Sequence, residues 1–252
     1  MKVTLVQANQ IWENKKANYA NFDLLLCGVE SDLIVLPEMF NTGFSMNADI
    51  LAENWIDSTA IDWLKQKAKN LDAAIYTSLI IKDQNSYYNR GVFVEPSGSI
   101  THYNKRKLFG LAKEDETFTP GTTREIVHYK GWKFLLQICY DLRFPEIARN
   151  SMNNNTFDYD AILYVANWPE KRSSHWNALL SARAIENQAY VIGVNRVGKD
   201  KSGLTYDGCS KMIDPLGNEH PCSVNEEQIK MVVLNSTELN KIRELMPFLK
   251  DV

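Results

Sequence analysis

The sequence predicts an α/β fold in which two sheets pack face to face between outer layers of helices, a four-layer α-β-β-α sandwich with internal pseudo-two-fold similarity. The first observation is an internal repeat, because residues 2–8 resemble residues 132–138 and residues 32–38 resemble residues 160–170. The second is that these strand segments are apolar on both faces, so each sheet needs helices on its outer side as well as a partner sheet inside.

The predicted elements follow one another in the same order in both halves. The first half is expected to contain a strand, a helix, a strand, a helix and a strand at about residues 2–8, 18–30, 32–38, 59–70 and 74–81. The second half is expected to contain strands beginning at 132 and 160, a helix at about 174–187 and a strand at 189–195. Turn residues at 96–98 and 215–217 predict a hairpin at the matching place in each half.

Composition indicates one compact enzyme-sized domain over residues 1–252, because 252 residues with 44% hydrophobic content can bury a large single core. A net charge of −3 argues against nucleic acid and against a membrane surface as partners, which leaves a small molecule. The four cysteines show no paired metal-ligand spacing, so we expect no metal, no cofactor and a reducing compartment. With no signal-like leader at the N-terminus, the predicted location is the cytoplasm.

Cys139 is the first candidate catalytic residue, because it follows an apolar strand and precedes a polar turn. After this turn comes Pro145, a residue suited to begin a helix. A thiol at such a tight strand-to-helix turn lies outside the sheet and close to backbone N–H groups that stabilise a thiolate or an oxyanion. A buried structural cysteine is the alternative interpretation.

Glu38 and Lys105 are the next candidates. Pro37 ends the strand at residues 33–36, so Glu38 is expected to project from the carboxyl end of that strand into a crevice. Lys105 lies in a basic cluster enclosed by aromatic and aliphatic residues. Taken alone, each residue also fits a solvated charge on a loop or an exposed face.

Together, the segments around Glu38, Lys105 and Cys139 resemble those of the nitrilase, or carbon–nitrogen hydrolase, superfamily, whose members use a Glu–Lys–Cys triad in that chain order. The segment at 114–121 is similar to the one that carries a second glutamate in the family, which corresponds to Glu114. One position departs from the pattern, since the family often has His where this chain has Lys107. The alternative register makes Lys107 the catalytic amine, but the Leu-Phe pair that follows favours Lys105.

The residue types suggest a mechanism of amide hydrolysis. Glu38 would accept the proton of the Cys139 thiol, while the Lys105 ammonium and the Tyr140 backbone N–H would stabilise the oxyanion. A thioester intermediate would then be hydrolysed by water that the same carboxylate activates. The resemblance alone implies that Glu114 orients Lys105 or assists with that water. A His-based cysteine triad remains as rival chemistry, although no histidine lies in a recognised setting for it.

Substrate-binding groups are expected where the strand at 160–166 meets the next helix. Asn167 and Trp168 should line the pocket, and Arg172 could clamp a carboxylate with two parallel hydrogen bonds, unless it is a surface residue with a structural partner.

The segments at 164–169 and 183–191 resemble the ω-amidase branch, whose members hydrolyse the terminal amide of 2-oxoglutaramate or 2-oxosuccinamate. Hydrolases of N-carbamoyl amino acids, deaminated glutathione or nitriles are the enzymatic alternatives, and a catalytically silent metabolite-binding or scaffold protein is the non-enzymatic one. The resemblance also implies a homodimer, to which the apolar stretch at 239–249 could contribute.

Overall fold

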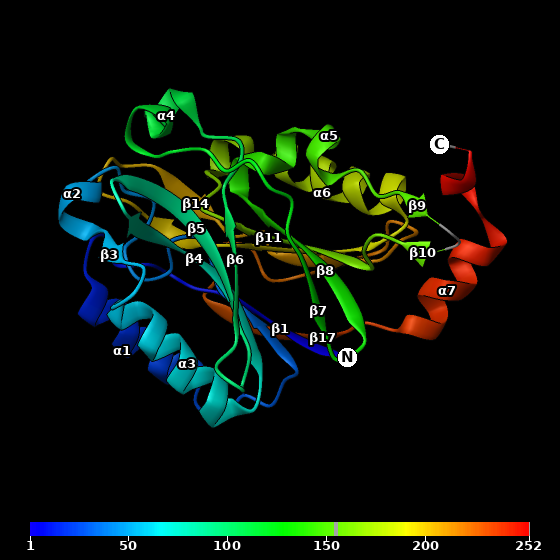
Figure 1. Cartoon of the computed structure of the whole chain (residues 1–252), viewed down its shortest axis with the longest axis horizontal. Helices are drawn as coiled ribbons and strands as arrows, with labels where there is room; N and C mark the ends of the chain where they lie inside the picture. The colour runs from blue at the N-terminus through cyan, green and yellow to red at the C-terminus, as the bar shows by residue number, and fades with distance from the viewer. Residues whose placement is uncertain (154–155, 252) are drawn as a thin grey trace.

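The computed structural model describes residues 1–153 and 156–251, and its first main sheet has the strand order β17-β1-β2-β4-β5-β6 with β3 beside β4 (Figure 1). β1, β2 and β4 run parallel, whereas β17, β5 and β6 are antiparallel to their neighbours. In chain order these strands span Lys2–Gln7 (β1), Leu33–Val35 (β2), Glu53–Asn54 (β3), Ala74–Asp83 (β4), Ser86–Val94 (β5), Ile100–Asn104 (β6) and Gln228–Val233 (β17).

The second main sheet repeats this arrangement with the order β7-β8-β11-β12-β15-β16. β8, β11 and β12 run parallel, and β7, β15 and β16 are antiparallel to their neighbours, so β8 corresponds to β1 and β11 to β2. The strands span Ile126–Tyr129 (β7), Trp132–Ile138 (β8), Ala161–Ala166 (β11), Tyr190–Asn195 (β12), Lys211–Ile213 (β15) and Glu219–Pro221 (β16). The matching order of parallel and antiparallel strands confirms the predicted internal similarity.

Helices cover the outer face of each sheet (Figure 1). α1 and α3 lie on the first sheet, where Phe22 and Leu64 pack against Ile34. α6 lies on the second sheet, where Trp176 packs against Ile162. The helices are Lys15–Leu25 (α1), Ala48–Leu51 (α2), Thr59–Leu71 (α3), Glu114–Thr117 (α4), Pro145–Ala148 (α5), Ser173–Asn187 (α6) and Ser236–Leu245 (α7).

The core between the sheets combines side chains of both halves, such as Leu5 and Val35 with Leu136 and Leu163, all of them fully buried. Burial of large aliphatic side chains on both faces of the parallel strands is the main source of stability for such a sandwich. This packing confirms the predicted four-layer α-β-β-α architecture.

The predicted helix at residues 18–30 is wrong at both ends, because α1 spans Lys15–Leu25. It begins early because the Asn14 side chain accepts a hydrogen bond from the Ala17 N–H and caps the helix. It ends before Gly28, whose φ of +72° is a conformation that terminates helices. Cys27 therefore lies in an exposed turn and not in a helix.

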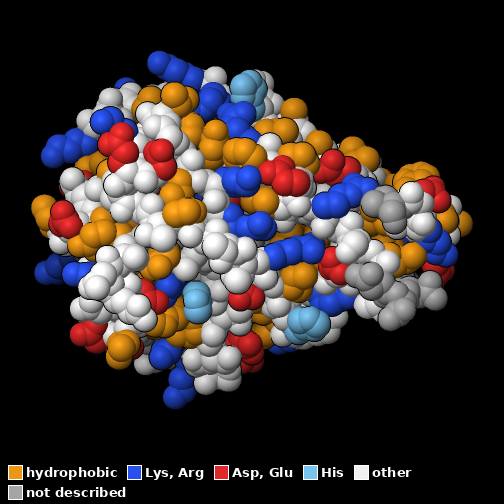
Figure 2. All heavy atoms as spheres, turned by 45° about the horizontal axis from the view of Figure 1, so that its top comes forward, with side chains coloured by type: hydrophobic (Ala, Val, Ile, Leu, Met, Phe, Trp, Pro, Cys, Tyr) orange, Lys and Arg blue, Asp and Glu red, His pale blue; other side chains and the backbone are white. Residues whose placement is uncertain are grey.

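Short elements complete the chain. Two small antiparallel sheets stand apart from the main sheets in the described part of the chain, one of Met152–Asn153 (β9) with Thr156–Phe157 (β10) and one of Val197–Lys199 (β13) with Thr205–Asp207 (β14). The 3₁₀ turns are Gly110–Ala112 (η1), Cys139–Arg143 (η2), Glu170–Arg172 (η3) and Phe248–Lys250 (η4). Among the described residues no helix is both long and apolar enough to cross a membrane. Basic and acidic side chains are interspersed on the face seen in Figure 2, in keeping with the small net charge of −3.

Candidate active site

Glu38 follows β2 through Leu36 and Pro37 and is fully buried. Its Oε1 accepts hydrogen bonds from Lys105 Nζ at 2.9 Å and from Asn89 Nδ2 at 2.8 Å. Its Oε2 accepts from the Asn167 N–H at 2.8 Å. One cation and two neutral donors thus compensate the buried carboxylate, which fixes its position at the carboxyl end of the parallel strands.

Lys105 follows β6 and is only 1% exposed, with Nζ 2.9 Å from Oε1 of Glu38 and 2.9 Å from each carboxylate oxygen of Glu114. Burial lowers its pKa, but the carboxylates of Glu114 and Glu38 raise it more, and the net shift is upward. The two carboxylates therefore favour the charged ammonium over the neutral amine at this place.

Glu114 begins α4 and is also fully buried. Its Oε2 accepts a hydrogen bond from the Phe109 N–H at 2.7 Å, and its Oε1 accepts from Asn89 Nδ2 at 3.0 Å. Asn89 on β5 therefore bridges Glu38 and Glu114. The sequence analysis missed it because nothing in its local sequence indicates a residue that binds catalytic carboxylates.

Lys107 lies elsewhere. Its Nζ is 3.0 Å from Oε1 of Glu146 in a partly exposed ion pair, and its ammonium lies 4.4 Å from the Phe144 ring centroid. The structure thus brings Lys105, and not Lys107, to the two buried carboxylates.

Cys139 is the first residue after β8, in η2, and its backbone has a φ of +42°. A non-glycine residue in this left-handed region is strained, as expected at a turn that presents a side chain to a site. Burial and the nearby Glu38 carboxylate raise the pKa of the thiol well above its usual value, against the opposing effect of the Lys105 ammonium. The resting group is therefore a thiol that needs a proton acceptor.

A network around Asp141, which the sequence analysis also missed, holds this turn. Asp141 Oδ2 accepts hydrogen bonds from the Ile138 N–H at 2.9 Å and the Tyr103 hydroxyl at 2.8 Å, and Oδ1 accepts from the Lys107 N–H at 2.9 Å. The Tyr76 hydroxyl donates to the Gln137 carbonyl at 3.0 Å. Both tyrosines belong to the first sheet. Their hydrogen bonds therefore hold the Cys139 turn, which follows a strand of the second sheet, in place from across the core.

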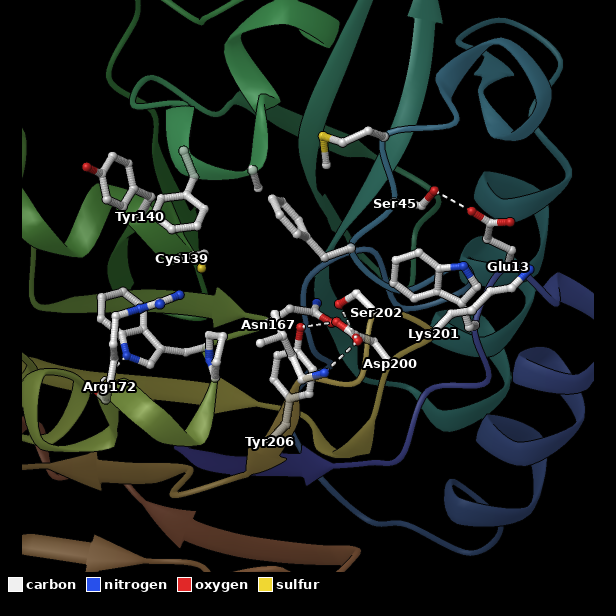
Figure 3. Close-up of a pocket in the computed structure, with 18 of the residues that line it drawn as sticks. Glu13, Ser45, Cys139, Tyr140, Asn167, Arg172, Asp200, Lys201, Ser202 and Tyr206 are labelled. Atoms are coloured by element: carbon white, nitrogen blue, oxygen red, sulfur yellow. Dashed lines mark hydrogen bonds between the residues drawn. The ribbon is translucent and has the colours of Figure 1, made fainter.

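A cavity of about 500 Å³ opens over Cys139 (Figure 3). Tyr140, Asn167, Trp168 and Arg172 all line it, and their role in binding a substrate stays a prediction. Trp168 is held by hydrogen bonds from its backbone N–H to Asn195 Oδ1 and from its Nε1 to the Arg172 carbonyl, both 2.8 Å.

Two arginines on the cavity wall have no carboxylate partner in the part of the chain that the structure describes. Arg172 lies with its guanidinium 5.2 Å from the Phe109 ring centroid, and Arg143, which sequence reasoning did not single out, lies 4.7 Å from the Trp168 ring centroid. The Arg143 guanidinium lies 3.2 Å from His175 Nδ1, a hydrogen-bond distance. Both cations are therefore available to an anion in the cavity.

The acidic side chains of the same cavity are already satisfied by neutral donors. Asp200 accepts from the Ser202 hydroxyl at 2.6 Å and from the Tyr206 hydroxyl at 2.8 Å. Glu13 accepts from the Ser45 hydroxyl at 2.6 Å, and Figure 3 shows these contacts on the side of the cavity away from Arg172. Lys201 also lines the cavity on that side, so the arginine pair Arg143 and Arg172 is one of two cationic regions that can face the anionic end of a ligand.

The site thus combines the thiol of Cys139 with the buried carboxylate of Glu38 and the ammonium of Lys105. These are the groups needed for nucleophilic attack on a carbonyl carbon, for moving the thiol proton and for stabilising an oxyanion. The guanidiniums of Arg143 and Arg172 line the wall of the same cavity.

Comparisons with known proteins show the family of the chain. The family model for carbon-nitrogen hydrolase matches residues 2–243. An omega-amidase from Yersinia enterocolitica is 48% identical over 86% of this chain and 82% of its own, and one from Escherichia coli K12 is 42% identical over 100% and 96%. A 2-oxoglutaramate amidase from Bacillus subtilis is 33% identical over 88% of this chain and 85% of its own.

Among solved structures, a superfamily protein from Xanthomonas campestris with an arsenic adduct in its active site is 36% identical. Its TM-score is 0.97, and the match covers 100% of this chain and 97% of that chain. The predicted resemblance is confirmed, and the chain belongs to the carbon–nitrogen hydrolase family.

Proposed function

We propose that this protein is an ω-amidase that hydrolyses the terminal amide of 2-oxo dicarboxylic acid monoamides, such as 2-oxoglutaramate and 2-oxosuccinamate, to the acid and ammonia. Relatives named omega-amidase and 2-oxoglutaramate amidase, at 48% and 33% identity, support this substrate class.

The observation that carries the proposal is that two guanidiniums on the wall of the cavity over Cys139, Arg143 and Arg172, have no carboxylate partner among the described residues. A short monoamide carries one carboxylate at the end opposite its amide. A guanidinium binds a carboxylate through two charge-assisted hydrogen bonds, and this contact would direct the amide carbon toward the thiol.

In the first half-reaction Glu38 accepts the thiol proton as the Cys139 sulfur attacks the amide carbon and the C–S bond forms. The ammonium of Lys105 and the backbone N–H of Tyr140 stabilise the oxyanion, and Glu114 keeps Lys105 in place through its two contacts of 2.9 Å. Protonated Glu38 then gives its proton to the leaving nitrogen, the C–N bond breaks and ammonia departs.

In the second half-reaction Glu38 accepts a proton from water as the water oxygen attacks the thioester carbon. The C–S bond breaks, the proton returns to sulfur, and the acid is released. Asn167 supports both steps because its N–H holds Glu38 Oε2 at 2.8 Å.

The test compares wild type with Arg172→Ala on 2-oxosuccinamate and on a slow, uncharged amide such as propionamide, with ammonia release as the readout. We expect the change to lower kcat/KM for the anion by about 100-fold and to leave the uncharged amide nearly unaffected, since only the anion uses the clamp. Equal losses on both substrates would show that Arg172 is structural. A wild-type preference for nitriles or N-carbamoyl amino acids would refute the ω-amidase assignment.

The proposal extends to a cytoplasmic homodimer. The four cysteines are unpaired in the structure, as expected in a reducing compartment. Sedimentation equilibrium of the purified protein tests the dimer directly.

A further inference from the structure

We propose that Asp141 is a positioning residue that ties the turn of Cys139 to the segment carrying Lys105, so that the thiol and the ammonium keep a fixed relation during the reaction. Cys139 and Lys105 come from different sheets, and both must act on one carbonyl group. A displacement of either by a fraction of an ångström would therefore be costly.

The contacts of Asp141 join the two segments directly. Oδ2 accepts from the N–H of Ile138, the residue before Cys139, at 2.9 Å. Oδ1 accepts from the N–H of Lys107, two residues after Lys105, at 2.9 Å. One carboxylate group thus bridges the nucleophile turn and the lysine segment, and its side chain is fully buried.

A third contact sets the position of Asp141 itself. The Tyr103 hydroxyl, on β6 just before Lys105, donates to Oδ2 at 2.8 Å, and Tyr103 is also fully buried. All three hydrogen-bonding neighbours are donors, so only a group that accepts at both oxygens satisfies them. Burial raises the pKa of Asp141 to about 6, which leaves the carboxyl mainly ionised at neutral pH and acceptor-only.

The backbone of Cys139 explains why such a tie is needed. A φ of +42° is unfavourable for a residue with a Cβ, and it persists only when the surroundings impose it. The bond from the Ile138 N–H to Asp141 fixes the residue on one side of this strained position. Without it the turn can relax, and the thiol of Cys139, which is partly buried at the cavity, becomes more exposed.

The test uses Asp141→Asn, which keeps the shape but places an amide NH₂ against one of the three donors. We expect kcat to fall by at least about 10-fold with KM within about threefold of wild type, because substrate contacts are retained. We also expect alkylation of Cys139 by iodoacetamide to speed up at least about threefold relative to Cys222, since thiol reactivity rises with exposure. Cys222 is a buried cysteine with 4% exposure, and it reports any general loosening of the fold.

Two further variants keep the test decisive if Asp141→Asn does not fold. Tyr103→Phe removes one donor and retains both backbone bonds, so it should shift both readouts in the same direction by a smaller factor. Tyr159→Phe removes a buried hydroxyl that donates to the Ala148 carbonyl, and it should change neither readout.

An unchanged ratio of the two alkylation rates in Asp141→Asn, or equal effects of Tyr103→Phe and Tyr159→Phe, would overturn the proposal. The rate readout rests on the proposed amidase function, whereas the alkylation ratio needs no substrate. A wild type that releases no ammonia from 2-oxoglutaramate would therefore refute the function and leave the role of Asp141 still testable.

Discussion

At the scale of single residues, Lys105 and Lys107 differ only in where the chain places them. Lys105→Met should lower kcat by at least about 100-fold, because the ammonium that contacts Glu38 and Glu114 at 2.9 Å would be missing from the transition state. Lys107→Met removes a partly exposed ion pair with Glu146 and should change kcat by less than about threefold. Steady-state ammonia release measures both. The reverse ranking of the two variants would show that Lys107 is the amine.

Cys139 and Cys27 allow a second comparison of residues. Cys27 is exposed, so iodoacetamide should label it readily, while the loss of activity should follow the labelling of Cys139 alone. Peptide mapping over time, with Cys27→Ser as the control, separates the two events. Full activity after complete modification of Cys139 would exclude the covalent mechanism.

Glu38, Lys105 and Cys139 could be singled out as candidates because each stands in a local pattern, an apolar run followed by a polar turn or a basic cluster, and the resemblance to the carbon–nitrogen hydrolases joined them into one predicted site. Asn89, Asp141 and Arg143 could not be assigned roles in this way. Their importance comes from partners far along the chain, such as the contact of Asn89 with both Glu38 and Glu114. Only the packing of the two sheets brings these groups together.

At the scale of elements, the loop after β6 carries both Lys105 and Glu114. Gly121 lies where this loop comes back to the backbone of Lys105. The Gly121 N–H donates to the Lys105 carbonyl at 2.9 Å, and a Cβ at Gly121 would lie 2.1 Å from the Asn104 carbonyl oxygen. Gly121→Ala must therefore displace the backbone next to Lys105. We expect kcat to fall at least about 10-fold, measured by ammonia release.

Gly110→Ala is the matched control in the same loop. A Cβ at Gly110 would make an ordinary contact of 3.5 Å with Asp115 Oδ1, so kcat should stay within about twofold of wild type. Equal effects of the two changes would mean that the loop adapts without moving Lys105.

Element types were predictable where the apolar period is regular, and helix ends were less so. α3 spans Thr59–Leu71 and α6 spans Ser173–Asn187, close to the predicted ranges. The start of α1 depends on one side-chain cap from Asn14 and its end on the backbone of Gly28, and the predicted range took neither into account.

At the scale of the whole molecule, the two halves are similar but not separable. The internal repeat predicts the parallel strands of each sheet, yet it does not predict that β17 from the end of the chain pairs with β1, with Lys2 opposite Val233. The first sheet is thus completed by the last strand, and an edge strand whose side chains are mostly accessible to solvent carries little local signal about its partner. We therefore predict that residues 1–252 unfold as one cooperative domain.

Arg243 on α7 gives a test of this cooperativity, since it fastens the C-terminal helix to the second half. It is 6% exposed, and its guanidinium donates to Asp160 Oδ1 at 2.9 Å, to the Gln188 carbonyl at 2.9 Å and to the Tyr159 carbonyl at 2.8 Å. Arg243→Ala leaves these acceptors without their donor and should lower the free energy of unfolding by about 3 kcal/mol.

Urea denaturation followed by tryptophan fluorescence and by far-UV circular dichroism measures the loss, and the two transitions should coincide in wild type and variant. Lys130→Ala is the control, because its ion pair with Asp32 has side chains 44% and 31% exposed and should contribute less than about 1 kcal/mol. A separate early transition in Arg243→Ala would show that α7 and β17 unfold independently of the sandwich. In that case β17 would not belong to the cooperative unit of the first sheet, and the prediction of a single cooperative domain would be refuted.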